Sequence, residues 1–301
     1  MSDLTQIRPE NAVEARTLCL LCGGSVQPTG HACGDRPELA VGRCEGCGLV
    51  RVMDFSHVTE SHYAADDYFP FDDAAIYGRE APWNAKRIER CVELLPMAAS
   101  RKVLDFGCGI GGFLKRSQQH FTGVIGFDLS RRLVEAHRVA GFPCVSDLAE
   151  VPADIDTIAL FHVLEHVPRP WLLVADLLKR FPAVDRVVVE VPHTGEALLS
   201  WFDSAPYRLN HHSADHVYYF TPATLRAVLE KAGLSVVVGT QLQRYSLGNT
   251  FGWLHSGCGG GQNRWTVFNE KSFHDAYEAV LVEAGVADSL FMIAKPGRCI
   301  A

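Results

Sequence analysis

The sequence contains no stretch of about 18 apolar residues, the length that an α-helix needs to cross a membrane. Residues 1–16, MSDLTQIRPENAVEAR, contain no apolar core of the kind that a secretory signal requires. Positive charge is also scarce, because 28 Lys and Arg are outnumbered by 35 Asp and Glu, which leaves a formal net charge of −7. These absences predict a cytoplasmic protein with no membrane contact. They also weigh against nucleic acid as a partner, since phosphate binding needs a basic face.

Internal repeats and low-complexity tracts are absent as well, so the 301 residues suit one α/β domain with a small addition. The composition divides the chain into four parts. Residues 1–16 are expected to form a flexible lead-in, 17–52 a cysteine module, 53–82 a connecting segment without clear periodicity, and 83–301 the main domain.

Short apolar runs alternate with amphipathic segments throughout the main domain. The runs expected as strands are 102–107, 124–129, 143–146, 155–161, 185–192, 234–240 and 289–296. The segments expected as helices are 83–95, 111–119, 131–140, 170–180 and 222–232. This order predicts a Rossmann-like, seven-stranded, mainly parallel sheet with helices on both faces. Two insertions, 193–220 and 241–286, exceed the minimal fold and are expected to carry substrate contacts.

Four of the ten cysteines form two CxxCG pairs, Cys19/Cys22 and Cys44/Cys47. Zinc takes four tetrahedral ligands, and a two-residue gap lets a tight turn direct both thiolates at one ion. The glycine after each pair can take a positive φ. The pattern predicts a zinc-ribbon-like module with a structural metal. The alternatives are coincidental or redox-active thiols, and competition from His31 and Cys33 as ligands.

A glycine-rich loop follows the first strand of the main domain and opens a helix, as a nucleotide-binding loop does. Gly107, Gly109 and Gly112 also satisfy the dinucleotide fingerprint GxGxxG. Asp105 favours a different ligand, because its carboxylate would oppose a pyrophosphate but suits the cationic amino-acid end of S-adenosylmethionine. Asp128 ends the next strand. A carboxylate at this place accepts hydrogen bonds from ribose hydroxyls, whether the ligand is a dinucleotide or S-adenosylmethionine.

Four motifs together resemble the class I S-adenosylmethionine-dependent methyltransferases. They are VLDFGCGIGGFL (103–114), GFDLS (126–130), FHVLEHVPRP (161–170) and DHVYYFTPATLRAVLEKAGLSV (215–236). More narrowly, the chain resembles zinc-containing sugar methyltransferases of bacterial polysaccharide and antibiotic pathways. The resemblance covers about residues 17–240, and it is more specific for the cofactor than for the substrate.

The resemblance also implies roles for individual residues. Asp105, Gly107, Gly109 and Gly111 would line the methionine end of the cofactor, Asp128 the ribose, and Leu129 and Asp147 the adenine. Phe161 and His162 would lie beside the sulfonium. Asp147 has an alternative role as a helix N-cap.

Histidines are the candidates for a general base on the acceptor side of the site, because an imidazole can take a proton near pH 7. His216 matches the histidine of a Tyr-x-x-His pair found in sugar C-methyltransferases, but Ser213 replaces the tyrosine. His216 is therefore predicted as the general base and His162 as the second candidate. His212 and His216 have i, i+4 spacing, yet the sequence places no third ligand beside them for a second metal.

The predicted function is methyl transfer from S-adenosylmethionine to a small-molecule acceptor, a sugar or nucleotide-linked sugar. One alternative is an RNA or protein methyltransferase that docks its polymer through the zinc module. The absence of an Asn/Asp-Pro-Pro-Tyr motif after the fourth strand weighs against chemistry on amides or exocyclic amines. The other alternative is a non-catalytic protein that binds S-adenosylmethionine.

The cysteine spacing predicts one zinc ion per chain, bound by Cys19, Cys22, Cys44 and Cys47. Replacing Cys44 with Ser removes one thiolate and should release the metal and loosen the N-terminal module. Metal analysis of the purified protein and of the Cys44→Ser variant measures this, and S-adenosylmethionine binding serves as the control that the cofactor loop is intact. Undamaged protein without zinc would contradict the prediction.

Overall fold

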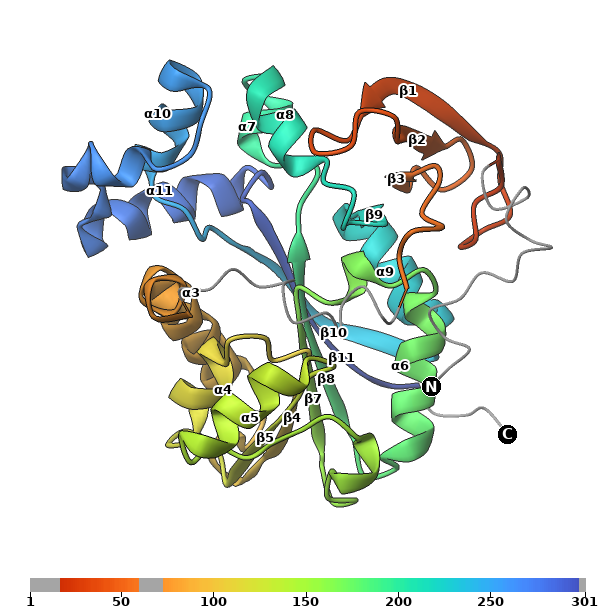
Figure 1. Cartoon of the computed structure of the whole chain (residues 1–301), viewed down its shortest axis with the longest axis vertical. Coiled ribbons are helices and arrows are strands. Elements are labelled where there is room, and N and C mark those ends of the chain that lie inside the picture. The colour runs from red at the N-terminus through yellow and green to blue at the C-terminus, as the bar shows by residue number, and fades with distance from the viewer. Residues whose placement is uncertain (1–16, 60–72, 298–301) are drawn as a thin grey trace.

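A seven-stranded sheet forms the centre of the computed structural model, which describes residues 17–59 and 73–297 (Figure 1). Its strands are β4 (Lys102–Phe106), β5 (Gly123–Phe127), β6 (Cys144–Val145), β7 (Thr157–Phe161), β8 (Arg186–Pro192), β10 (Leu234–Leu242) and β11 (Ser289–Pro296). They lie in the order β10-β11-β8-β7-β4-β5-β6. The pairings from β8 to β6 are parallel, whereas β11 is antiparallel to both β8 and β10. The seven predicted strands are all present, and β11 makes the sheet mixed.

The inner strands β4, β7, β8 and β11 read as nearly continuous apolar runs because both faces of the sheet are covered there. Side chains alternate between the faces along each strand. In β11, Leu290 and Met292 join one apolar core, whereas Phe291 and Ile293 join the other. The two cores lie on opposite sides of the sheet, so a single strand stabilises both helical layers.

Helices cover the two faces in separate groups (Figure 1). One face carries α3 (Asp73–Leu94), α4 (Gly112–Ser117) and α5 (Arg131–Val139), and the other carries α6 (Pro170–Arg180) and α9 (Pro222–Lys231). The α3 helix begins inside the segment expected to be a connection, ten residues before the predicted start at Trp83. Pro82 lies within this helix. Proline usually marks a helix boundary, which explains the late predicted start.

Each insertion contributes helices above the carboxyl ends of the strands (Figure 1). The 193–220 insertion forms α7 (Ala197–Ser200), α8 (Ala205–His211) and the short strand β9 (Tyr218–Tyr219). The 241–286 insertion contains α10 (Leu247–Ser256) and α11 (Lys271–Glu283). Parallel α/β sheets bind their ligands at this end, so both insertions lie where an acceptor would be held.

The cysteine module forms a second sheet together with the main domain. Its strands β1 (Val26–Ala32), β2 (Ala40–Cys44) and β3 (Val50–Val52) are antiparallel, and β3 pairs with β9 of the 193–220 insertion. Apolar residues of the module, among them Val26 and Leu49, belong to the same core as α6 and α9. The module is therefore built into the main domain and does not stand apart from it.

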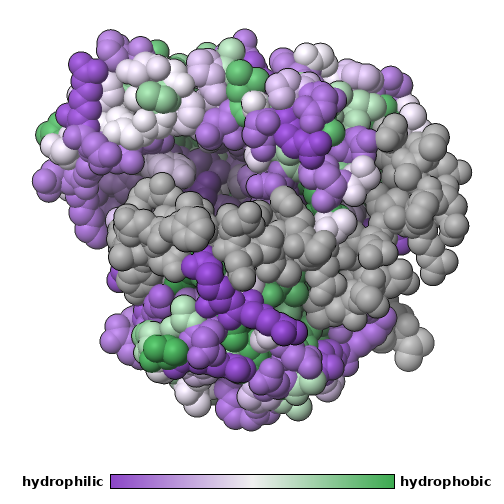
Figure 2. Space-filling view, in the orientation of Figure 1, coloured by the Kyte–Doolittle hydropathy of each residue, from purple (hydrophilic) through white to green (hydrophobic). Residues whose placement is uncertain are grey.

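The described surface is mostly hydrophilic on the face that Figure 2 shows, with hydrophobic residues scattered over it. Within the part of the chain that the structure covers, no helix combines the length and the apolar character that crossing a membrane requires.

Asp35 joins the cysteine module to the 193–220 insertion. Its carboxylate accepts hydrogen bonds from the Ala214 backbone N–H at 2.9 and 3.2 Å and from the Ser213 hydroxyl at 3.1 Å. Replacing Asp35 with Ala leaves these donors without their partner and should lower the free energy of unfolding by about 1–2 kcal/mol. Denaturant titration measures the change.

The control for that experiment is Glu38→Ala, which removes an exposed ion pair between Glu38 and Arg36. Exposed pairs of this kind contribute about 0–1 kcal/mol, so the control should unfold nearly as the parent protein does. Equal losses in the two variants would contradict a linking role for Asp35.

Candidate active site and metal centre

The loop after β4 has the backbone shape that a close ligand requires. Gly107, Gly109 and Gly111 have φ values of 73°, 51° and 79°, a region that side chains rarely adopt. A Cβ on Gly107 would lie 2.8 Å from the Val163 side chain. Glycine therefore suits the turn at all three positions, and at Gly107 the lack of space requires it as well.

Asp105 lies at the end of β4 and is buried, and its Oδ2 has no hydrogen-bond partner among the described residues. Burial raises the pKa of Asp105 to about 7, although the positive charge of Arg87 acts in the opposite direction. An unpaired buried carboxylate oxygen is costly. A cationic amino group bound beside the glycine loop would pair with it, which fits the amino-acid end of S-adenosylmethionine.

Asp128 follows β5 and faces the same loop. Its Oδ2 accepts the Gly109 N–H at 2.8 Å, and its Oδ1 accepts the Ser130 N–H at 3.0 Å. Burial raises the pKa of Asp128, whereas these two backbone hydrogen bonds lower it. Each carboxylate oxygen keeps a lone pair for a ribose hydroxyl. Leu129, half-buried, comes next in the chain.

Asp147 and Phe161, for which the resemblance implies contacts with the cofactor, also have structural roles. Asp147 caps the short helix Leu148–Glu150 through a 2.8 Å hydrogen bond from the Ala149 N–H to its Oδ1. The Phe161 ring is buried between the Phe113 ring at 4.8 Å and the Arg87 guanidinium at 4.5 Å. Their contacts with a cofactor stay predictions.

His162 stands at the end of β7 in an unusual backbone conformation, with a φ of 57°. Its Nδ1 lies 3.1 Å from Oε1 of the fully buried Glu165. Its Nε2 lies 3.0 Å from Nη1 of Arg244 and 3.2 Å from Oε1 of Glu190. The imidazole is thus held between two carboxylates and a guanidinium, and a left-handed backbone at such a place is a strained feature often found at functional sites.

The residues that hold His162 were not predicted from the sequence. Arg87 of α3 donates two hydrogen bonds to Glu190, from Nε at 2.7 Å and from Nη2 at 3.0 Å. The Nε–H of Arg244 donates a hydrogen bond to Oδ1 of Asp288 at 3.3 Å. Although burial acts to raise the pKa of Glu190, Arg87 and His162 hold it well below its usual range. The one signal in the sequence is Glu190 itself, a single charge within the apolar run VVVEVP.

His216 precedes β9, and its ring packs edge-on against His166 with 4.8 Å between the ring centroids. Burial, reinforced by the neighbouring His166, lowers the pKa of His216 to about 3, so its imidazole is neutral at pH 7. Its aromatic neighbours Tyr218, Tyr219 and Phe220 are core residues exposed by 2% or less.

His212, the i−4 neighbour of His216, lies in different surroundings. Its ring contacts Tyr219 at 4.7 Å and His31 at 6.1 Å. His212 and His216 therefore do not form the two-histidine arrangement that their spacing suggested.

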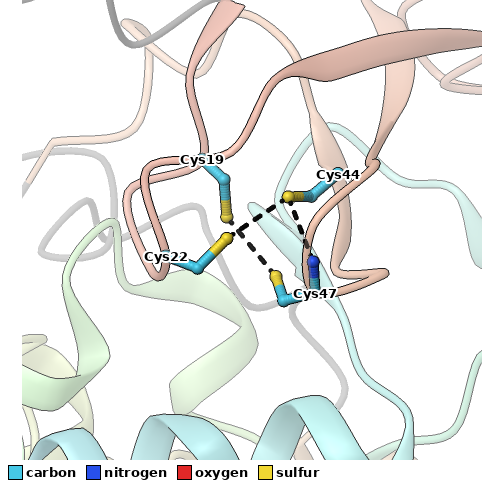
Figure 3. Close-up of side chains that lie close together, drawn as sticks. All are labelled: Cys19, Cys22, Cys44 and Cys47. Atoms are coloured by element: carbon cyan, nitrogen blue, oxygen red, sulfur yellow. Dashed lines mark hydrogen bonds between the residues drawn. The ribbon is translucent and has the colours of Figure 1, made fainter.

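The four cysteines of the CxxC pairs converge on one point (Figure 3). Cys19 and Cys47 have sulfur atoms 3.7 Å apart, and those of Cys22 and Cys44 are 3.5 Å apart. Tetrahedral Zn–S bonds of about 2.3 Å place sulfurs about 3.8 Å apart, so the donor set fits zinc. Gly23 and Gly48 take the expected positive φ values of 78° and 76°. Cys33 lies elsewhere, with its sulfur 3.9 Å from the Tyr219 hydroxyl.

Comparison with known proteins identifies the part of the chain that holds this site. A family model described as a methyltransferase domain matches residues 79–238. The chain is 33% identical over 172 residues to a ubiquinone biosynthesis O-methyltransferase of Xylella fastidiosa, an alignment that covers 50% of this chain and 67% of that protein. It is also 33% identical over 174 residues to the protein of that name from Xanthomonas euvesicatoria, with coverage of 51% and 70%.

A solved structure agrees with the fold. It is a chain from the complex of the Haloferax volcanii Trm112 methyltransferase activator with a methyltransferase. The TM-score is 0.51 at 14% identity, and the alignment covers 79% of this chain and 98% of that one.

The position of Asp128 predicts the effect of removing its carboxylate on cofactor binding. The Asp128→Ala variant loses charge-assisted hydrogen bonds to the ribose and should bind S-adenosylmethionine about 1–3 kcal/mol more weakly. Isothermal titration calorimetry measures this.

Asp176→Ala is the matched control, because it removes an exposed carboxylate of α6 that pairs with Lys179, and it should leave the affinity unchanged. Unchanged affinity in Asp128→Ala, or preferential binding of NAD by the parent protein, would count against the cofactor site.

Proposed function

Because this chain belongs to the methyltransferase-domain family and is an S-adenosylmethionine-dependent methyltransferase, we propose that it methylates a hydroxyl oxygen of a small-molecule acceptor. The acceptor would bind above the carboxyl ends of β7 and β8, between the 193–220 and 241–286 insertions. S-adenosylmethionine supplies an electrophilic methyl group on its sulfonium. Asp105 would bind its amino group and Asp128 its ribose.

The observation that carries the proposal is the pair of partners around Nε2 of His162. In the neutral imidazole, Nδ1–H donates to Glu165 and the Nε2 lone pair accepts from Arg244 at 3.0 Å. In the protonated imidazole, Nε2–H can donate to Glu190 at 3.2 Å. Both protonation states therefore have a partner in place, which a residue that takes up and releases a proton needs.

We prefer His162 to His216 as the general base for this reason. His216, with a pKa of about 3, binds a proton too weakly to retain one from a hydroxyl. His162 also follows β7 directly, at the end of the sheet where the cofactor loop lies. The acceptor hydroxyl would approach Nε2 in place of Arg244.

The class of acceptor rests on two lines of support. The sequence motifs favour a sugar or nucleotide-linked sugar but leave the methylated atom open, whereas the relatives are named for O-methylation in ubiquinone biosynthesis. The choice of a hydroxyl oxygen as the acceptor atom is therefore supported by the relatives alone.

The cysteine module supports a small acceptor as well. We propose that its four thiolates hold a structural zinc ion, because they leave no open coordination position. Its strand β3 and residue Asp35 hold the 193–220 insertion in place. This position argues for a wall of the acceptor site and against a platform for docking RNA or protein.

Replacing His162 with Gln should lower kcat by about 10²–10⁴-fold, the usual contribution of a positioned base, while leaving S-adenosylmethionine affinity nearly unchanged. Formation of S-adenosylhomocysteine is measured with catechols, other phenols and nucleotide-diphosphate sugars as acceptors.

The control is His120→Gln, a partly exposed histidine after α4 that bonds to Gln119. Full turnover in His162→Gln would remove His162 from the mechanism. Methylation of amine or polymer acceptors alone would overturn the proposed reaction.

A further inference from the structure

A cavity of about 670 Å³ lies between the cysteine module and the 193–220 insertion. Strands β1 and β2 form one wall, and α7, α8 and the turn after β8 form the other (Figure 1). Small-molecule sites commonly measure about 300–1,000 Å³. The described residues that line this cavity do not include His162, Arg244 or Asp105, so it is separate from the proposed cofactor and acceptor sites.

Basic side chains from both walls meet in this cavity. His31 and Arg43 come from the cysteine module, whereas Arg208 and His212 come from α8 and the residue that follows it. Glu45 is the single acidic residue among the described residues that line the cavity. The cavity is therefore basic, although the chain as a whole carries a net charge of −7.

Both arginines have N–H groups that can bind a ligand. The Arg43 side chain is exposed and makes no ion pair or hydrogen bond with the described residues. The Arg208 side chain is 18% exposed, and its Nη2 donates to the exposed carboxylate of Asp203. Its Nε and Nη1 have no partner in the described part of the chain. A guanidinium presents its N–H groups in a planar fork that matches the oxygens of a phosphate.

His212 is the buried member of this basic group, with 6% of its surface exposed. Its Nδ1 is buried, and neither ring nitrogen hydrogen-bonds to a residue that the structure describes. A neutral imidazole carries one N–H, which needs an acceptor when it is buried. Burial, followed by the positive charges of His31 and Arg208, lowers the pKa of His212 to about 4. An anion in the cavity would accept the imidazole N–H and reverse the effect of the two charges.

The rest of the wall suits an uncharged part of the same ligand. Pro28, Val41 and Leu199 line the cavity beside the basic side chains. An inorganic phosphate ion would leave most of the 670 Å³ unfilled. Binding sites for small molecules typically combine such apolar walls with a few charged groups that fix the orientation of the ligand.

We propose that this cavity binds a phosphate-bearing small molecule of about the size of a nucleoside diphosphate. Arg43 and Arg208 bind the phosphate oxygens, His212 donates one further hydrogen bond, and the apolar wall covers the uncharged part. The two walls belong to the cysteine module and to the 193–220 insertion, so the ligand joins them and stabilises the folded protein. The proposal does not depend on the reaction at His162.

Binding of UDP to the full-length protein tests the site. S-adenosylhomocysteine is present at a saturating concentration, so that the proposed cofactor site is occupied. Isothermal titration calorimetry should show one UDP bound per chain. Pyrophosphate and uridine should each bind more weakly than UDP, because each provides only one part of the ligand. UDP should also raise the Tm, since it binds the folded state alone.

Arg208→Met and Arg43→Gln should each weaken UDP binding at least about tenfold, because each removes charge-assisted hydrogen bonds to phosphate. The matched control is Arg36→Gln, which removes an exposed arginine of the same module that lies outside the cavity. This control should bind UDP as the parent protein does, and so should His162→Gln, which is altered in the acceptor cleft. Thermal unfolding without ligand establishes that each variant is folded.

Absence of UDP binding by the parent protein at millimolar concentrations overturns the site, and this result does not depend on the folding of a variant. Parent-like affinity in folded Arg208→Met and Arg43→Gln also overturns it. Uridine binding as tight as that of UDP would show that the phosphates are not recognised, and equally tight pyrophosphate binding would show that the apolar wall is not used. Each of these results contradicts the proposed ligand.

The His162→Gln variant separates this proposal from the proposed function. Weaker UDP binding in His162→Gln would place UDP in the acceptor cleft and would overturn the separate site. Full turnover in His162→Gln with parent-like UDP binding would contradict the proposed mechanism and leave the phosphate site standing.

Discussion

The buried ion pair between Glu190 and Arg87 is the interaction on which the site depends. Glu190 is 1% exposed at the carboxyl end of β8, and a charge in such a place must be paired and hydrogen-bonded. Arg87 pairs with it through two hydrogen bonds and also covers the Phe161 ring. Removing one partner of such a pair typically costs about 3–5 kcal/mol, because the other charge remains buried.

The same ion pair connects the glycine loop, where we propose the cofactor binds, with His162, the proposed general base. One turn before Arg87, Asn84 accepts a hydrogen bond from its Nη1 at 2.7 Å and packs against Gly112 of the cofactor loop. Glu190 in turn lies against His162. Through α3, the position of the cofactor loop and the orientation of the histidine are therefore set by one buried network, which favours a fixed distance between methyl donor and acceptor.

The cysteine module acts on the opposite side of the cleft. Through β3 and β9 it fixes the segment that carries His216, and through Asp35 it fixes the turn at Ser213 and Ala214. Its small apolar surface merges with the core formed by α6 and α9. A metal-bound module of this size gains most of its stability from the ion. The proposed zinc site and the proposed wall of the acceptor pocket are thus connected through β3, β9 and Asp35, although the two lie in different parts of the chain.

The local chemistry of this protein could be predicted from its sequence. The glycines of the cofactor loop, the seven apolar runs and the CxxC pairs each act through short-range geometry, such as a positive φ at Gly107 or a tight turn after Cys22, and short-range geometry is encoded in neighbouring residues. The partners of His162 and His216 could not be predicted in this way. Arg87, Glu165, Glu190 and Arg244 come from separate elements, and neither spacing nor composition says which charges will meet. Only packing of α3, β7, β8 and the two insertions around one sheet decided that, because a buried charge finds its counter-charge in space and not along the chain.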